Sequence, residues 1–132
     1  MQITKQADYA VRAMAYLARL ETNQRAATSD IAQAQKIPPS FLAKIISQLS
    51  IAGLIHTSRG AHGGVMLARP AARISMLDVV EAIDGPISLN DCVLSPDTCN
   101  QVEDCPMHEI WSDLQKELVK KLGSSTFDKF VR

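Results

Sequence analysis

Two adjacent prolines between two short apolar segments constrain the fold of this chain more than any other feature. The segment DIAQAQ is followed by a turn at residues 36–39 and then by the longer segment SFLAKIISQLSIAGLI. Thr28 or Ser29 can cap a first short helix, and Pro39 suits the first position of a second helix because that position needs no backbone N–H. The pattern predicts two helices joined by a tight turn, which is a helix-turn-helix.

The second of these helices is predicted to run from Pro39 to about Gly53 and to bury one face. The residues of that face recur at helical spacing and are Leu42, Ile45, Ile46, Leu49 and Ala52. In a DNA-binding helix-turn-helix, the amino end and the outward face of this helix enter the major groove. The second helix is therefore the candidate element for reading DNA.

Four residues on the outward face are candidates for contact with DNA. Ser40, Lys44 and Gln48 can hydrogen-bond to base edges or phosphates. Phe41 can lie against a thymine methyl group, and it can equally be a partly buried packing residue. We therefore expect polar contacts from three positions and leave both roles open for Phe41.

A glycine-rich reversal after the helix-turn-helix predicts a β-hairpin. LIHTSR and VMLARP contain β-branched and apolar residues, and GAHGG between them favours a turn. A two-stranded hairpin in this position is a wing. Arg59, beside the glycines, is placed to enter a minor groove, and His62 could contact a phosphate, although both residue types are also common in solvated loops.

Three further helices complete the predicted fold. The first runs from about Lys5 to Leu20 with Thr4 as its cap, and another lies in ISMLDVVEAIDGP, where Ser75 and Asp78 are spaced as a capping box. The last covers PMHEIWSDLQKELVKKL and has an apolar stripe, which must be buried against its own domain or against a second copy of the chain. The stripe comprises Met107, Ile110, Trp111, Leu114, Leu118 and Leu122.

These elements define the fold class as mainly α with a small β-hairpin. Residues 1–73 form a winged helix-turn-helix DNA-binding region, and residues 74–132 form a cysteine loop and a long C-terminal dimerisation helix, within one compact chain. Residues 1–73 contain nine lysines and arginines against three acids, a net charge of +6, and residues 74–132 contain five against eleven, a net charge of −6. The basic part has the electrostatics of a phosphate-binding protein.

The sequence gives no indication of export or membrane insertion. Arg12 and Arg19 interrupt the first apolar stretch, which argues against a signal peptide, and the uncharged run at residues 45–55 is too short to cross a bilayer. We therefore expect a cytoplasmic protein without a membrane partner. We do not expect an enzyme, because no paired catalytic acid and base accompany the cysteines.

The cysteines lie close together and indicate metal or redox chemistry. Cys92, Cys99 and Cys105 are followed by His108, with six, five and two intervening residues. In a reducing cytosol, an odd number of clustered thiols argues against structural disulfides. Cys105 and His108 share one face at the start of the last predicted helix and can converge on one ion. Thiolates select iron-sulfur clusters or zinc, and the wide gaps favour a cluster, with a thiol switch or inert cysteines as the other interpretations.

Taken together, these motifs resemble the iron-sulfur-dependent winged-helix regulators, the family of the cluster-assembly repressor IscR, the nitric-oxide sensor NsrR and the iron regulator RirA. The resemblance covers essentially the whole chain, through ADYAVRAMAYLA, IPPSFLAKIISQLSIAGLI, SRGAHGGVMLARP, DVVEAIDGP and the three-cysteine loop. It implies a homodimer, joined through the last helix, that binds double-stranded operator DNA and regulates transcription, as a repressor, according to the state of its cluster. Iron-sulfur status, redox state or nitric oxide would be the signal.

The resemblance also assigns ligands by position. Cys92, Cys99 and Cys105 would hold the cluster. The fourth ligand differs between members of the family: a histidine corresponding to His108 serves a [2Fe-2S] cluster, whereas an aspartate corresponding to Asp8, donated by the other subunit, serves a [4Fe-4S] cluster. Both residues are present in this chain.

A cluster-free thiol redox sensor that binds DNA is the alternative function. In such a sensor Cys105, activated by the end of the last helix, would be oxidised and would form a disulfide with Cys92 or Cys99. The residues alone leave this alternative open beside the iron-sulfur interpretation.

Overall fold

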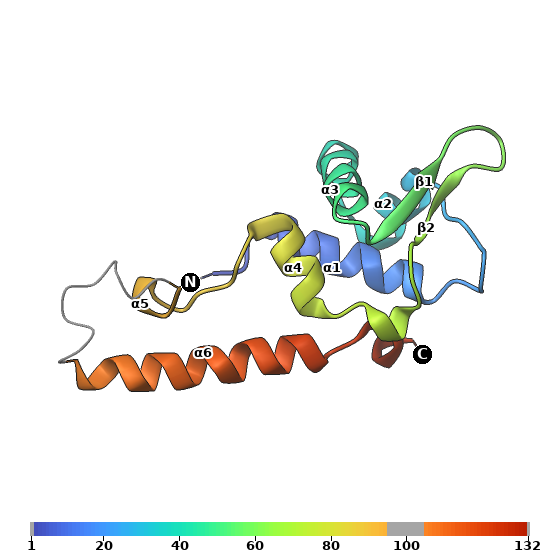
Figure 1. Cartoon of the computed structure of the whole chain (residues 1–132). Helices are drawn as coiled ribbons and strands as arrows, with labels where there is room; N and C mark the ends of the chain where they lie inside the picture. The colour runs from blue at the N-terminus through green and yellow to red at the C-terminus, as the bar shows by residue number, and fades with distance from the viewer. Residues whose placement is uncertain (1, 95–104, 132) are drawn as a thin grey trace.

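The computed structural model describes residues 2–94 and 105–131, and these residues form helices around a short β-hairpin (Figure 1). The predicted fold class, mainly α with a winged helix-turn-helix, is confirmed. In chain order the elements are α1 (Lys5–Ala18), α2 (Thr28–Gln35), α3 (Pro39–Ile51), β1 (Ile55–Ser58), β2 (Gly64–Leu67), the 3-10 turn η1 (Ala71–Arg73), α4 (Met76–Asp84), α5 (Asp91–Leu94), α6 (Pro106–Ser124) and the 3-10 turn η3 (Phe127–Phe130). In the described part of the chain, no helix is both long and apolar enough to span a membrane.

Local hydrogen bonds explain where two of the helices begin. The Thr4 hydroxyl accepts the backbone N–H of Ala7 at the start of α1, as predicted. The predicted capping box is also present at α4, where the Ser75 hydroxyl accepts the Asp78 N–H and the Asp78 carboxylate accepts the Ser75 N–H. The backbone N–H and the hydroxyl of Thr4 donate in turn to the carboxylate of Asp84, which ties the start of α1 to the end of α4.

One predicted helix cap is wrong. Thr28 is the first residue of α2 and not its cap; the cap position is Ala27, which has no side chain able to accept a hydrogen bond. The first helix ends at Ala18, close to the predicted end near Leu20. Helix ends commonly fray over one or two residues.

The helix-turn-helix has a tight turn and an apolar interface. Lys36 ends α2 in the left-handed conformation, with φ of 55°, and Pro39 begins α3 as predicted. The predicted inner face of α3 is buried at Leu42, Ile45, Ile46 and Leu49. Ala52, predicted on the same face, is exposed, because α3 ends at Ile51 and Ala52 follows the last helical residue.

The wing is a two-stranded antiparallel hairpin extended by one further backbone pair. Strands β1 and β2 pair from Ile55 with Leu67 to Ser58 with Gly64. Ala26, in the segment between α1 and α2, exchanges two backbone hydrogen bonds with Val65, at 2.9 and 2.8 Å. Gly64 makes this approach possible: its φ is +141°, and a Cβ atom there would lie 2.7 Å from the carbonyl oxygen of Ala26.

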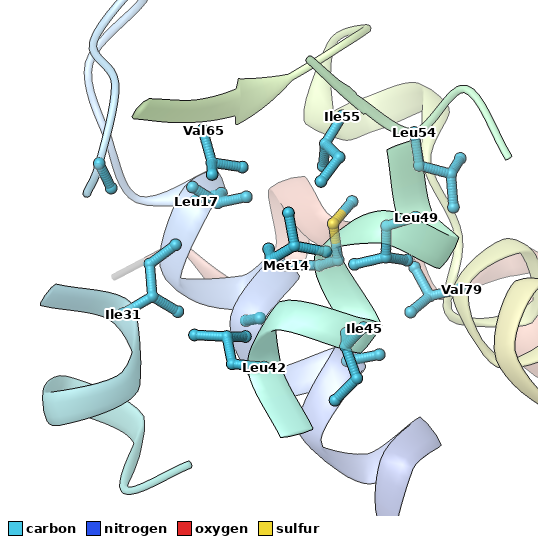
Figure 2. Close-up of a cluster of buried hydrophobic side chains, with 14 of the residues drawn as sticks. Met14, Leu17, Ile31, Leu42, Ile45, Leu49, Leu54, Ile55, Val65 and Val79 are labelled. Atoms are coloured by element: carbon cyan, nitrogen blue, oxygen red, sulfur yellow. The ribbon is translucent and has the colours of Figure 1, made fainter. Parts of the chain in front are cut away.

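One hydrophobic core joins the helix-turn-helix, the wing and the helices α1 and α4 (Figure 2). Met14 and Leu17 from α1 meet Ile31 from α2, several apolar residues of α3, Ile55 and Val65 from the hairpin, and Val79 from α4. Helix α4 contacts α1 and α3 on one side and α6 on the other. A displacement of α6 can therefore be transmitted to α3 through α4, which contacts both helices.

The C-terminal segment is anchored in the same core. Phe127 in η3 is fully buried and has an edge-to-face contact with Phe130, with 5.5 Å between ring centroids. The Met76 N–H donates to the Ser125 carbonyl at 2.9 Å, and the Phe127 N–H donates to the Ile74 carbonyl at 3.0 Å. The C-terminal end of α6 is thereby fixed to the body that carries α3.

The predicted apolar stripe of α6 divides into two parts. Leu118 and Leu122 pack on a second cluster of buried residues, formed by Ala7, Val80 and Ile87. The other residues of the stripe are exposed, at 57, 59, 39 and 43% for Met107, Ile110, Trp111 and Leu114. Figure 1 shows the reason: the amino-terminal half of α6 extends beyond the body formed by α1 to α4. We call these four residues the outer face of α6.

Candidate DNA-binding surface and cysteine site

The outward side of α3 presents three of its four candidate residues to solvent. Ser40, Phe41 and Lys44 are exposed near the amino end of the helix. The ring of Phe41 also contacts Tyr9 of α1, with 6.4 Å between centroids and 53° between ring planes. Phe41 is 46% exposed, so it packs on α1 with one edge and keeps the rest of its ring available to a partner.

Gln48 differs from these residues because it is half-buried. Its Oε1 atom is covered, and within the described part of the chain it has no hydrogen-bond partner. A buried carbonyl oxygen without a partner is unfavourable by about 1–3 kcal/mol. Gln48 therefore offers mainly its amide nitrogen to a ligand on this side of the protein.

Arg59 and His62 lie on the exposed loop of the wing, and Arg59 also borders a groove between the wing and α3. The groove brings together elements that are separate in the sequence: α3, β1, β2 and the start of α2. Besides Arg59, its lining contains five hydroxyl groups, from Thr28, Ser47, Ser50, Thr57 and Ser58. Hydroxyls and a guanidinium in one groove form a surface suited to the phosphate backbone of DNA.

Arg25 is a functional candidate that the sequence analysis missed. Its Nη1 atom donates a hydrogen bond of 2.6 Å to the hydroxyl of Ser58, the residue before Arg59. Arg25 therefore links the segment between α1 and α2 to the end of β1, beside the wing loop. The contact has no local sequence signal, since the two partners are 33 positions apart.

Two of the three cysteines lie in the described part of the chain, and Cys99 lies outside it. Cys92 is 8% exposed in the short helix α5, which packs against α6. Cys105 is half-buried at the cap position of α6, directly before Pro106. Helix α5 falls within a region that the sequence predicted only as a loop.

His108 lies one turn into α6, and its N–H donates to the Cys105 carbonyl at 3.1 Å. The Nδ1 atom of its ring is buried and has no hydrogen-bond partner among the described residues. A buried imidazole nitrogen normally has a partner, and a neutral imidazole nitrogen without one is a metal-ligand candidate. Cys105 and His108 are thus two candidate metal ligands, both half-buried and one turn apart at the start of α6.

Asp8 has a different environment. Its carboxylate forms an ion pair of 3.0 Å with Arg12 one turn later in α1, and both side chains are nearly half exposed. Within the described part of one chain, no three histidine, cysteine, aspartate or glutamate side chains are close enough together to hold a metal ion. The structure thus places Cys105 and His108 one turn apart at the start of α6 and leaves Asp8 in a surface ion pair.

Comparison with known proteins identifies the family. Residues 3–132 match the family described as Rrf2, iron-dependent transcriptional regulator. An HTH-type transcriptional regulator of Mycobacterium tuberculosis is 44% identical over 88 residues, which are 67% of this chain and 55% of that protein, so the chain spans about half the length of this relative.

Two solved structures share the whole fold. CymR of B. subtilis, a global cysteine regulator, has a TM-score of 0.83 at 26% identity, over 98% of this chain and 96% of that chain. IscR of T. potens has a TM-score of 0.74 at 25% identity, over 98% of this chain and 85% of that chain. These matches confirm the resemblance drawn from the sequence motifs. The chain belongs to the Rrf2 family of transcriptional regulators.

Proposed function

We propose that the protein is a homodimeric, operator-binding repressor whose affinity for DNA is controlled by an iron-sulfur cluster. Residues 1–73 bind DNA, and residues 74–132 hold the cluster and form the dimer contact. The observation that carries the cluster assignment is the Nδ1 atom of His108, which is buried and has no hydrogen-bond partner among the described residues, one turn after Cys105 at the cap of α6. A neutral imidazole and a thiolate are ligands typical of such groups.

In the proposed complex, α3 enters the major groove and the wing follows the adjacent backbone. Ser40 and Lys44 contact base edges or phosphates, while Phe41 contributes an apolar surface that Tyr9 holds in place. Arg59 enters the minor groove and His62 contacts a phosphate. The hydroxyls of the groove between α3 and the wing bind the intervening phosphates, and Gln48 has a secondary role because its Oε1 is covered.

We assign the outer face of α6 to the dimer contact, with a second copy of this chain as the partner. Four large apolar side chains on neighbouring turns of one helix are unfavourable in water. A two-fold axis beside α6 would pair this face with itself and would place two α3 helices on one side of a duplex. The operator would then be roughly palindromic.

Cys92, Cys99 and Cys105 would hold the cluster, with His108 as the fourth ligand. The described donors fit such a group, since Cys105 and His108 are adjacent and α5, which carries Cys92, packs against α6. When bound, the group supplies a redox-active centre that reacts with oxidants and nitric oxide. Cys105 and His108 lie at the start of α6. Loss or oxidation of the cluster would therefore act directly on the helix assigned to the dimer contact.

The alternative fourth ligand is Asp8 of the partner subunit, which would first have to leave its ion pair with Arg12. An exposed ion pair of this kind stabilises the folded chain by less than about 1 kcal/mol, so breaking it to free the Asp8 carboxylate requires little free energy. His108 is nevertheless the better-supported ligand, because its Nδ1 atom is already buried without a hydrogen-bond partner among the described residues and follows Cys105 by one helical turn.

A thiol switch is the second candidate function, favoured by the similarity in fold to a global cysteine regulator. Two cysteine thiols would lose two electrons and two protons to peroxide, which would be reduced to water, and a disulfide would form. Cys105 is the accessible member of the described pair, and Cys92 is nearly buried.

Anaerobic purification distinguishes these two functions. We expect the wild-type protein to be coloured and to contain iron and sulfide, and His108→Ala to lose most of the cluster or to change its absorption and Mössbauer spectra. Asp8→Ala serves as the matched control and should keep the wild-type spectrum. If the wild type stays colourless and free of iron after reconstitution, the cluster assignment is wrong. Peroxide-dependent DNA binding that Cys105→Ser abolishes would then establish the thiol switch.

The DNA-binding mode predicts a specific dependence on salt. Lys44→Ala and Arg59→Ala should each weaken binding to duplex DNA and should lower the slope of log affinity against log salt by about 0.9 for each lost phosphate contact. Lys116→Ala on α6 removes the same charge far from α3 and should leave the slope unchanged. Fluorescence anisotropy between about 50 and 200 mM salt measures both quantities. Equal slopes for all four proteins would contradict the assigned surface.

A further inference from the structure

A single carboxamide on α6 holds the chain segment that leads into the cysteines. The Nε2 atom of Gln115 donates a 2.6 Å hydrogen bond to the carbonyl oxygen of Ile87, and its Oε1 accepts a 2.9 Å hydrogen bond from the N–H of Leu89. Both bonds are partly buried. One side chain thus satisfies a donor and an acceptor of the same extended segment, as a neighbouring β-strand would.

The segment held in this way is continuous with Cys92. Ile87 is buried in the second cluster of apolar residues. Asn90 follows Leu89, and its side-chain oxygen accepts a hydrogen bond from the N–H of Asp91 at the start of α5. Cys92 comes next and is 8% exposed. The contact of Leu89 with α6 therefore lies three residues before this thiol and acts on its position together with the packing of α5 against α6.

Gln115 also lies on the side of α6 that carries the other described donors. It is seven residues after His108, a separation of two helical turns or about 10 Å along the axis, so both side chains lie on one stripe. This stripe is displaced from the outer face by roughly a quarter of a turn around the helix, and both of its residues are half-buried whereas Ile110 and Leu114 are exposed. One side of α6 thus contacts the cysteine-bearing segment, while the neighbouring outer face is available to a second copy.

We propose that Gln115 is a positioning residue: its carboxamide fixes the segment carrying Cys92 against α6 and so couples any movement of the cysteines to that helix. The coupling to DNA binding depends on the function proposed above, whereas the positioning of Cys92 does not. Charge plays little part in this contact because a carboxamide is neutral. A lysine or glutamate side chain of similar length could not make both bonds, since an ammonium group only donates and an ionised carboxylate only accepts.

Two substitutions of Gln115 distinguish the contributions of its two hydrogen bonds. Gln115→Leu keeps the approximate volume and the helix propensity and removes both bonds, whereas Gln115→Glu keeps the acceptor for Leu89 and removes the donor for Ile87. Ser112→Ala, on the same side of α6 and one turn earlier, is the control. Circular dichroism should show the same helix content for all of these proteins.

The first measurement uses the reduced, metal-free full chain. In Gln115→Leu, we expect alkylation of Cys92 by iodoacetamide, followed by peptide mass spectrometry, to be about tenfold faster than in wild type, and amide exchange at Leu89 to accelerate by a similar factor. Gln115→Glu should show an intermediate rate at Cys92 with Leu89 still protected. Alkylation of Cys105 should be unchanged throughout. Wild-type rates at Cys92 and Leu89 in both Gln115 variants would overturn the proposal.

The second measurement tests the coupling in the anaerobically purified protein. We expect Gln115→Leu to release iron to a chelator severalfold faster than wild type and Ser112→Ala, and to shift the operator affinity towards that of the metal-free protein. Faster alkylation in a protein that never binds iron would support the positioning role while the cluster assignment fails. Normal alkylation in a protein that does bind iron would overturn the positioning role and leave the cluster assignment intact.

Discussion

Ile110→Glu is expected to convert the protein from a dimer into a monomer. Burial of one isoleucine side chain contributes about 2 kcal/mol, and a two-fold interface contains the substituted position twice. Loss of both contributions, together with two carboxylates brought into an apolar contact, should weaken dimerisation by a factor on the order of a thousand. Sedimentation velocity over a range of protein concentrations measures this shift, and operator binding should fall with it, because a monomer contacts a single half-site.

Ile51→Glu is the matched control for this experiment. Ile51 is 85% exposed at the end of α3 and borders the groove beside the wing, far along the chain from α6. The same chemical change there should leave the dimer intact and weaken DNA binding by placing a negative charge near the phosphates. A dimer that survives Ile110→Glu and dissociates with Ile51→Glu would exclude the outer face of α6 as the interface.

Phe127→Ala is expected to have the largest effect on folding stability. The side chain is fully buried, and truncation of a buried phenylalanine typically lowers the free energy of unfolding by about 3–5 kcal/mol. A domain of this size has about 5–15 kcal/mol in total, so the variant should unfold at much lower urea concentration. The measurement should be made at one fixed protein concentration, because the proposed dimerisation would make the stability depend on concentration.

Phe41→Ala is the control for this substitution, because it removes the same side chain at a position that is 46% exposed. We expect a loss of about 1 kcal/mol there, mainly from the contact with Tyr9. Equal destabilisation by the two substitutions would show that η3 does not contribute to the core. If Phe127→Ala also raises the protease sensitivity of α6, the anchoring role of its C-terminal end is supported directly.

The winged helix-turn-helix could be predicted from sequence because its signals are local. Pro39 fixes the start of a helix by its own geometry, Ser75 and Asp78 interact across three residues, and the glycines of the wing permit a reversal that few other residues allow. The apolar spacing of α3 likewise reports which side is buried. Each of these features depends on neighbours within about one helical turn.

The contacts that could not be predicted join residues distant in sequence. Arg25 and Ser58 are 33 positions apart, and Gln115 lies 26 and 28 positions from its two partners. Phe127 follows the last periodic helix in a short polar segment, so its complete burial has no periodic signal. The division of the α6 stripe has the same cause, since helical periodicity predicts a face but does not reveal how far the supporting body extends beneath it.

The anchoring of α6 at Phe127 has a consequence for the choice of operator. Because its C-terminal end is fixed in the core that holds α3, each subunit would carry its recognition helix at a set distance and rotation from the two-fold axis. One added base pair between half-sites moves the second half-site by about 3.4 Å and turns it by about 35°. The dimer would therefore bind only operators whose half-sites are separated by one particular number of base pairs, so that spacer length would contribute to its specificity.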